Sequence, residues 1–420
     1  MRKTRKTRTA LAVVSLLLLC VMAVNLTGCR ASVKAASLMD GVTPNRVTPL
    51  GELDGGAVDV TDFAIRLLEK TYADGENTLV SPLSVMCALA MLANGAEGET
   101  REQMESLLGM SVSELNLYLY SYLSHLPQGE KYKLNVANSI WFKDDDRLTV
   151  NPAFLQTNAD YYGADIYKTS FDEQTLKDIN GWVKDETDGM IPEVLKEIPE
   201  EAIMYLVNAL SFEAEWASVY EKAQVKDGTF TKEDGTEQDV ELMYSGEFMY
   251  IEDGNATGFI KEYSGGKYAF AALLPNEGVS VCEYIESLDG ASLNGILSEA
   301  EYRSVMTAIP KFKTDYSVEL SKILQSMGMI YAFAPDLADL DGLGEWRDGE
   351  ILVGQVLHKT YIEVGEKGTR AGAVTVVEAD GGSGAPDEIK EVYLDRPFVY
   401  MLIDCETNIP FFIGTVMDVD

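Results

Sequence analysis

The side chains that most often carry out chemistry are sparse in this chain. His125 and His358 are the only histidines among 420 residues, which excludes a His-rich metal site and disfavours a His-dependent catalytic centre. Ser383 lies in Gly381-Gly-Ser-Gly384, which lacks the spacing and the preceding strand of a nucleophile elbow. No zinc-protease, Walker or dinucleotide-binding motif occurs. We expect no enzyme, no metal and no cofactor, with a hydrolase built from scattered carboxylates as the alternative.

The segment 366–386 is the most informative stretch, because it is long for a loop and lies between two predicted strands. Taken at alternate positions, one face holds only small or medium uncharged residues, and every charge falls on the other face. The first face holds Thr369, Ala371, Ala373, Thr375, Val377 and Ala379, and the second holds Arg370, Gly372, Val374, Val376, Glu378 and Asp380. Such alternation is typical of a half-buried strand. We predict a loop that is exposed in a metastable state and later inserts into a sheet; an ordinary strand before a Gly/Ser turn is the alternative.

The elements that would position this loop begin after an export signal. Five basic residues within 2–8 precede the apolar run Ala10–Val24, which is short for a membrane span. Leu26-Thr-Gly-Cys29 then resembles a bacterial lipobox. We predict a lipoprotein signal peptide over 1–28, a lipid on Cys29, a flexible tether over 29–56 and a secreted protein anchored to the membrane at the cell surface. An ordinary signal peptide with a chance Cys, or a simple N-terminal anchor, remains open.

The composition is that of a globular acidic protein. The formal net charge is −34 and hydrophobic residues make up 46%, so the chain can build a large core but repels nucleic acid. Cys87, Cys282 and Cys405 are far apart and are interpreted as small buried residues, not as a disulfide framework. We expect a monomer that binds no nucleic acid.

Residues 57–420 are predicted to form a single α+β domain. Helices are expected at Val58–Tyr72, Leu83–Asn94, Glu99–Leu108, Ser113–His125, Leu176–Thr187 and Ser317–Met327, with two short ones within 279–300. Strands are expected at Lys133–Phe142, Ala202–Phe212, Tyr268–Leu274, Ile351–Val364, Pro397–Ile403 and Pro410–Val416. Helices dominate the front and strands the back without a βαβ rhythm, which indicates mixed sheets. Helix 83–94 is apolar nearly all round and should be central, with Ser81 as its N-cap.

Several short blocks of the sequence stand out between residues 57 and 420. They are Ser81-Pro-Leu-Ser84, Ile179-Asn-Gly-Trp182, Leu206-Val-Asn208-Ala209 with Trp216, Pro310-Lys-Phe312, His358-Lys359, Glu366-Lys-Gly368-Thr369 with Ala371 and Ala373, and Leu394-Asp-Arg-Pro397-Phe398. In this order the blocks resemble the serpin family over roughly 57–420. The block at Glu366 resembles the hinge of its reactive-centre loop, and the block at Leu394 resembles the segment beyond that loop.

The resemblance implies a fold of three β-sheets and about nine helices, with an exposed reactive-centre loop at about 366–390. It implies a suicide-type serine protease inhibitor. The target cleaves the loop, the hinge inserts into the main sheet, and the acylated protease is dragged along and trapped. The protein is consumed in this reaction and is not an enzyme.

The resemblance also assigns roles to single residues. The hinge is Glu366, Gly368, Thr369, Ala371 and Ala373. Ser81, Ser84, Asn208 and His358 are similar to the polar cluster that controls opening of the main sheet, although buried polar groups can also simply satisfy one another. Trp216 and Lys311 mark the site where the hinge first enters, with Lys311 paired to Glu366.

Counting from the hinge places the reactive bond at Gly382–Ser383, whereas counting back from Pro397 moves it toward Pro386. The bond therefore lies within 380–386, a window without Lys, Arg or a large aromatic residue. We expect elastase-like or subtilisin-like targets that prefer small residues. Arg370 and Gly372 depart from the family pattern, but neither puts a charge on the inserting face. A non-inhibitory serpin that acts as a surface binding protein is the alternative.

Overall fold

The computed structural model of the chain describes residues 33–51, 53, 55–198, 203–347, 349–370 and 389–419. Nine α-helices lie in these ranges, and all but α6 lie at least partly in a range that the sequence predicts as helical. The helices are α2 (Gly56–Thr71), α3 (Pro82–Ala93), α4 (Gly98–Leu108), α5 (Val112–His125), α6 (Pro152–Tyr162), α7 (Glu173–Glu186), α8 (Val281–Glu286), α9 (Gly290–Ser298) and α10 (Ser321–Ser326).

The main sheet has seven strands among the described residues, in the order β1-β5-β3-β6-β15-β14-β12. These strands are β1 (Ala36–Ser37), β5 (Asp165–Thr169), β3 (Tyr132–Lys143), β6 (Met204–Glu215), β15 (Gly368–Thr369), β14 (Gln355–Gly365) and β12 (Phe312–Glu319). The neighbours β6 and β14 run parallel, whereas β15 runs antiparallel to both.

A second sheet has nine strands, in the order β16-β11-β8-β9-β10-β17-β18-β2, with β7 paired to β8. These strands are β16 (Lys390–Tyr393), β11 (Glu301–Pro310), β8 (Glu237–Glu252), β9 (Ala256–Glu262), β10 (Tyr268–Pro275), β17 (Phe398–Asp404), β18 (Pro410–Val416), β2 (Thr78–Val80) and β7 (Val225–Thr231). The short strands β4 (Leu148–Val150) and β13 (Gly344–Trp346) form a third sheet. The predicted α+β class with three sheets is confirmed.

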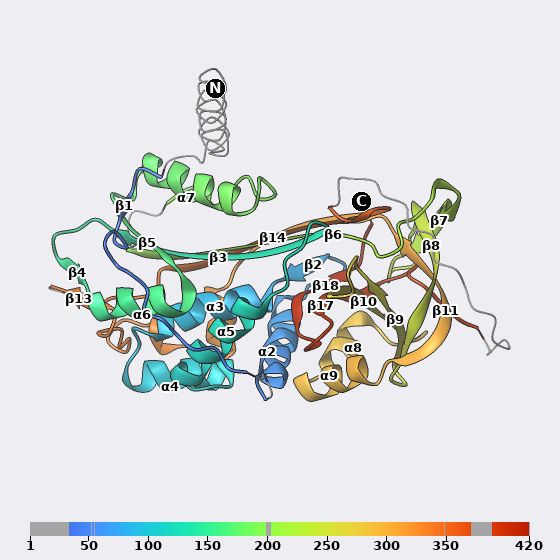
Figure 1. Cartoon of the computed structure of the whole chain (residues 1–420), viewed down its shortest axis with the longest axis horizontal. Helices are drawn as coiled ribbons and strands as arrows, with labels where there is room; N and C mark the ends of the chain where they lie inside the picture. Colours follow the sequence, from blue (N-terminus) through green and yellow to red (C-terminus); the bar gives the residue numbers. More distant parts are fainter. Residues whose placement is uncertain are drawn as a thin grey trace, which may run out of the picture.

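Helices cover the main sheet on both faces. In Figure 1, α7 lies on one face, and α3, α5 and α6 lie on the other. Every residue of α3 is buried, as expected for a helix that is apolar nearly all round, because α3 contacts strands of both large sheets. Ser81 precedes α3 at the N-cap position, but its side chain makes no capping hydrogen bond. The amphipathic α7 buries Ile179, Trp182 and Val183 against the outer face of the sheet.

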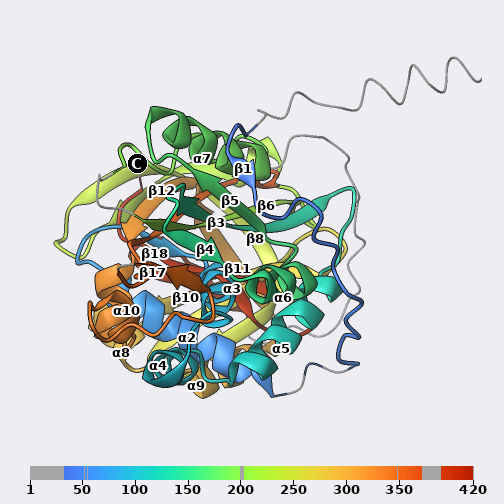
Figure 2. The same cartoon turned by 90° about the vertical axis from the view of Figure 1, so that its left-hand side faces the viewer.

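The N-terminal segment 33–51 differs from the flexible tether predicted for 29–56. Its strand β1 adds to the edge of the main sheet beside β5. The carboxylate of Asp178 in α7 accepts hydrogen bonds from the backbone N–H groups of Lys34 (3.0 Å) and Ala35 (2.9 Å). Further along, Asp160 of α6 accepts from Asn45, and Ser121 of α5 accepts from the N–H of Leu50. Figure 2 shows the segment running from β1 past α6 toward α5.

Two local predictions are wrong. Ser317–Met327 is not one helix, because β12 continues to Glu319 in register with β14 and only Ser321–Ser326 is helical. Cys87 is buried as predicted, but Cys282 is half-buried and Cys405 is exposed in the turn after β17; all three are free thiols. Helix α6, which the sequence analysis did not predict, begins at Pro152, and the side chain of the preceding Asn151 caps it.

Candidate functional site

The seam between β6 and β14, in the interior of the main sheet, is held by few backbone pairs. These two strands pair only over Tyr205–Asn208 and Gln355–His358, four pairs of residues. On its other side, β6 pairs with β3 over eleven pairs, from Tyr132 to Phe142. Beyond His358 the ladder of β6 and β14 stops, and among the described residues only the hinge strand β15 lies between the two strands, at the far end of the seam. The middle of the seam therefore leaves edges of two strands at which another strand can pair.

The third and fourth residues of the predicted loop, Gly368 and Thr369, already lie in this seam. Gly368 pairs with Glu215 of β6 and Gly365 of β14, and Thr369 pairs with Ala214 and Val364. Gly368 has φ +150°, and a Cβ atom there would overlap the carbonyl oxygen of Ala214, so only glycine fits. Thr369 is buried, and its hydroxyl is hydrogen-bonded to the hydroxyl of Tyr263. Thr369 thus faces the body of the molecule, as the alternation predicts.

Trp216 holds the turn that leads into the hinge. Its indole N–H donates to the carbonyl oxygen of Gly365 (2.9 Å), and its backbone N–H donates to that of Lys367 (2.8 Å). The indole ring is buried and stacks on Tyr263 at a centroid distance of 4.4 Å. The ring stack thus fixes both ends of the turn from Gly365 to Thr369, since Tyr263 also contacts Thr369.

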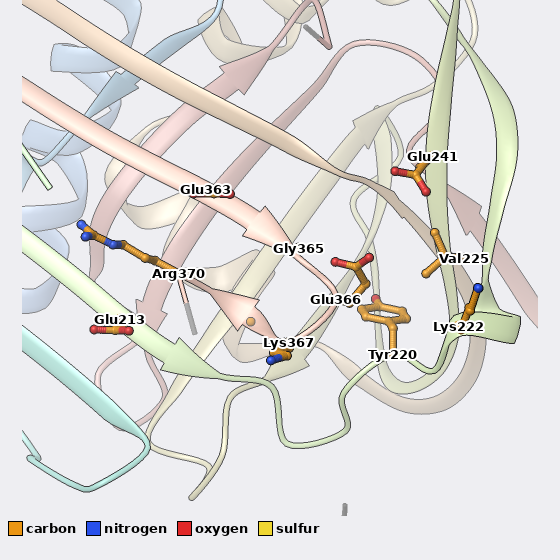
Figure 3. Close-up of a pocket in the computed structure, with 11 residues that line it drawn as sticks. Glu213, Tyr220, Lys222, Val225, Glu241, Glu363, Gly365, Glu366, Lys367 and Arg370 are labelled. Carbon is orange, nitrogen blue, oxygen red and sulfur yellow. The ribbon is translucent and has the colours of Figure 1, made fainter. Parts of the chain in front are cut away.

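The predicted ion pair of Lys311 and Glu366 is present, and Lys311 also lies 3.0 Å from Glu241. The hydrogen bond from Lys311 lowers the pKa of the Glu366 carboxyl. Glu366 lines an open pocket beside the hinge, whose volume is about 890 Å³ and whose lining also includes Tyr220 and Arg370. Figure 3 shows Glu366 on the side of Tyr220 and Glu241, with Arg370 extending away from it.

A buried lysine beneath Trp216 was missed by the sequence analysis. Lys261 of β9 is 1% exposed and pairs with Glu247 at 2.7 Å. Its ammonium group lies 4.6 Å from the ring centre of Tyr220 and 5.4 Å from that of Trp216. In a strand of alternating polar and apolar residues, a lysine is predicted to be exposed. No local sequence pattern predicts that Lys261 lies beside the hinge.

The four predicted cluster residues come together where the paired part of the seam ends. The backbone N–H of Ser81 donates to Nε2 of His358 (3.0 Å), and the amide of Asn208 donates to the carbonyl oxygen of Ser84 (2.8 Å). The serines therefore contribute backbone groups, not hydroxyls. Asn138 of β3, which was not predicted, accepts a hydrogen bond from Asn208 and completes the cluster.

The cluster leaves several buried polar atoms without a partner among the described residues. They are the hydroxyls of Ser81 and Ser84, Oδ1 of Asn208 and Nδ1 of His358. Because Nε2 of His358 accepts the Ser81 N–H, the proton of the neutral ring must lie on Nδ1. Burial lowers the pKa of His358 to about 4. The Nδ1–H donor of His358, the Oδ1 acceptor of Asn208 and the two serine hydroxyls thus have no partner among the described residues, a costly arrangement that a further strand could relieve.

The other predicted site residues fall outside the described residues. They are Ala371 and Ala373 of the hinge, the reactive-bond pair Gly382 and Ser383, and Cys29. Among the described residues, no group of three or more His, Cys, Asp or Glu side chains could hold a metal ion, and no helix is long and apolar enough to cross a bilayer.

The family model for serpins, described as serine protease inhibitor, matches residues 59–419. The chain belongs to the serpin family. Relatives of this serpin include rat alpha-1-antiproteinase (28% identical, covering 86% of this chain and 88% of the rat protein). Mouse leukocyte elastase inhibitor A is also 28% identical and covers 85% and 97% of the two chains.

Two solved structures of another serpin, in different states, are similar to this chain. The thermophilic serpin tengpin in its native state has a TM-score of 0.88 at 47% identity, covering 92% of this chain and 100% of that one. Tengpin in its latent state has a TM-score of 0.78 at 43% identity. The arrangement described for this serpin is therefore more similar to the native state.

Proposed function

We propose that this serpin is a suicide-type inhibitor of serine proteases that cut after small residues, of the elastase-like or subtilisin-like kind. The observation that carries the proposal is the β6–β14 seam, which is paired over four residues at one end and holds Gly368 and Thr369 at the other. A loop that starts inside such a seam can continue into it without changing its register.

The register of β15 supports the proposed inserting face. Since Thr369 pairs with Ala214 and Val364, each step along an inserting strand moves one residue down both neighbours. Ala371 would then meet Phe212 and Ile362, whose side chains are buried on the body side. The uncharged face of 369–379 would lie against the core, and Arg370, Glu378 and Asp380 would lie on the opposite face.

The same register brings Thr375 opposite Asn208 and His358. A threonine hydroxyl can accept one hydrogen bond and donate another. It could accept from Nδ1 of His358 and donate to Oδ1 of Asn208, the two buried groups that lack partners in the described structure. Insertion would thus convert unsatisfied groups into paired ones, which supports a gain in stability after cleavage.

Incubation with an elastase-type and a subtilisin-type protease tests the proposal. We expect a covalent one-to-one complex that survives SDS, a cut within 380–386 mapped by mass spectrometry, and a raised melting temperature of the cleaved serpin. A trypsin-type protease is the control, because that window holds no Lys or Arg. A chain that is cut without forming a complex and without gaining heat stability would be the non-inhibitory serpin of the alternative.

We further propose that the serpin works at the cell surface, held by a lipid on Cys29 after removal of 1–28. The lipobox-like residues 26–29 support this location. Incorporation of radiolabelled palmitate into the full chain tests it, and Cys29→Ala should abolish both the label and membrane sedimentation.

A further inference from the structure

Exposed large apolar side chains of this serpin gather on one sheet face. Of the seven such side chains among the described residues, four lie on the outer face of β8, β11 and β16. We call these four the outer patch, and they are Phe248 (56% exposed), Tyr302 (83%), Met306 (39%) and Ile389 (56%). Single exposed hydrophobic residues are ordinary, but a contiguous group on one face marks an interaction site.

The outer patch is held together by strand pairing. Phe248 and Tyr302 stack with their ring centres 5.9 Å apart and their planes within 13°. Met306 pairs with Gly246 of β8 on one side and with Glu391 of β16 on the other. Because Ile389 is two residues before Glu391, it lies on the same side of the sheet. A register shift between Tyr302 and Val305 turns the tyrosine ring onto Phe248.

The place of Ile389 in the chain identifies what would cover the outer patch. Ile389 directly follows residues 371–388, and the proposed cleavage window 380–386 ends three residues before it. At about 3.5 Å per extended residue, the reactive bond lies within roughly 10 to 30 Å of Ile389. A protease domain of about 240 residues has a radius of gyration of about 18 Å, so it is about 45 Å across. A protease engaged at that bond is therefore large enough, and close enough, to reach the surface around Ile389.

The charges around the outer patch favour a basic partner. The exposed carboxylates of Glu252, Glu301 and Glu391 lie on the same three strands, β8, β11 and β16. The two cations at the rim each lie beside a carboxylate, Lys390 at 3.5 Å from Glu252 and Arg303 at 3.6 Å from Glu301. The rim therefore carries an excess of negative charge, in a chain whose net charge is −34. Such a rim attracts cationic proteins and steers their approach.

We propose that the outer patch is a second docking surface for the target protease, in addition to the reactive-centre loop. The partner it fits is a cationic serine protease with apolar side chains ringed by basic residues beside its substrate cleft. This inference rests on the proposed function, since it is the loop that brings the protease to this face. The patch would select among proteases that accept the same small residues at the reactive bond.

The double variant Phe248→Ser/Tyr302→Ser tests the proposal in the full-length serpin. We measure the second-order rate constant with which a cationic elastase-type protease attacks the loop, with melting temperature as the folding check. We expect a fall of about tenfold to a hundredfold, because exposed aromatic anchors commonly dominate an interface. The matched control is Ile330→Ser/Leu337→Ser, which removes two similarly exposed apolar side chains near α4, at the other end of the molecule. The control should stay within about twofold of the wild type.

The outcomes separate this inference from the proposed function. If the protease is trapped, the rate constant is measured from complex formation. If it is not trapped, the rate constant is measured from loop cleavage. The docking surface can therefore be tested even if the serpin does not inhibit. An unchanged rate constant in a folded double variant would overturn the docking surface while leaving inhibition intact. A second outcome would also overturn the docking surface. If the wild type dimerises, the double variant does not, and the two have equal rate constants with the protease, the face binds a second copy of the chain.

Discussion

Strand β6 has two edges within one sheet, and they are built differently. Its edge toward β3 is paired continuously over eleven residues, whereas its edge toward β14 is paired over four and then capped by the two-residue strand β15. Both edges are covered by α7 and the core. Backbone pairing and packing set local stability. The sheet can therefore open between β6 and β14, whereas it cannot open between β6 and β3. This difference in pairing alone indicates that the proposed insertion occurs between β6 and β14, whatever the sequence of the loop.

The largest expected effect comes from blocking the open edge. Thr369→Arg would put a charge against Tyr263 on the buried face, where it has no partner. We expect the inhibitory rate constant to fall at least about a hundredfold while loop cleavage continues, as followed by complex formation on SDS gels. Arg370→Ala, at the neighbouring position on the opposite face, is the control and should inhibit normally. Unimpaired inhibition by Thr369→Arg would show that the face assignment is wrong.

The second prediction concerns the polar cluster at the paired end of the seam. The pKa of His358 is about 4 in the folded state, below that of a histidine in the unfolded chain, about 6.5. The unfolded state therefore binds more protons between these values, and stability is lost as the pH falls from about 6.5 to 4. Between pH 7 and 4.5 the wild type should lose about 2–3 kcal/mol of its free energy of unfolding through His358. We expect His358→Gln to lack this loss, as measured by urea unfolding at both pH values.

The exposed His125 provides the control for this measurement, since it lies at the end of α5 far along the chain from the seam. His125→Gln removes a histidine outside the seam and leaves the polar cluster intact. Equal pH profiles for His358→Gln and the wild type would mean that the buried ring does not titrate with folding.

The third prediction moves to the outer edge of the same sheet, where β1 adds to β5. Asp178→Ala leaves the N–H groups of Lys34 and Ala35 without their acceptor, and we expect a loss of about 2 kcal/mol in the free energy of unfolding. Hydrogen exchange should show faster exchange over 33–40. Lys34→Ala is the control, because it removes only an exposed side-chain contact with Gln174 and keeps the backbone bond. Similar exchange in both variants would mean that Asp178 does not hold this edge.

The smallest effect is expected at the ion pair beside the hinge. Glu366 is 43% exposed and Lys311 is 27% exposed, so solvent screens their interaction. We expect Glu366→Gln to cost less than about 1 kcal/mol, a shift in melting temperature of about 1–2 °C by calorimetry. A much larger drop would mean that the pair itself keeps the hinge in the seam.

Much of this arrangement could be predicted from periodicity. Alternation assigned Thr369 to the buried face and Arg370 to the other, and the apolar helix 83–94 was expected at the centre, because both patterns reflect burial directly. Lys261 could not be found in this way. Its burial depends on Glu247 and two aromatic rings that are distant in sequence.

The N-terminal segment shows a second limit of sequence reasoning. Residues 33–51 have the polar, Pro- and Gly-containing composition of a linker, and composition alone predicts no fixed structure. Their order comes from backbone groups bound by Asp178 and Ser121, partners that only the folded domain provides. Ser81 and Ser84 show a different limit. The sequence places both serines in the polar cluster, but the contacts are made by their backbone atoms and not by their hydroxyls.

Strands β17 and β18 lie between β10 and β2 in the second sheet, although β2 is made from residues 78–80 and β18 ends at residue 416. A ribosome must therefore translate nearly the whole chain before β2 can pair with its neighbour β18. Until then the nascent polypeptide carries an unfinished core with exposed strand edges, a state that chaperones recognise and proteolysis removes. Folding of this protein is in this sense a final event of its synthesis, and truncation anywhere upstream of β18 would leave a chain without a closed core.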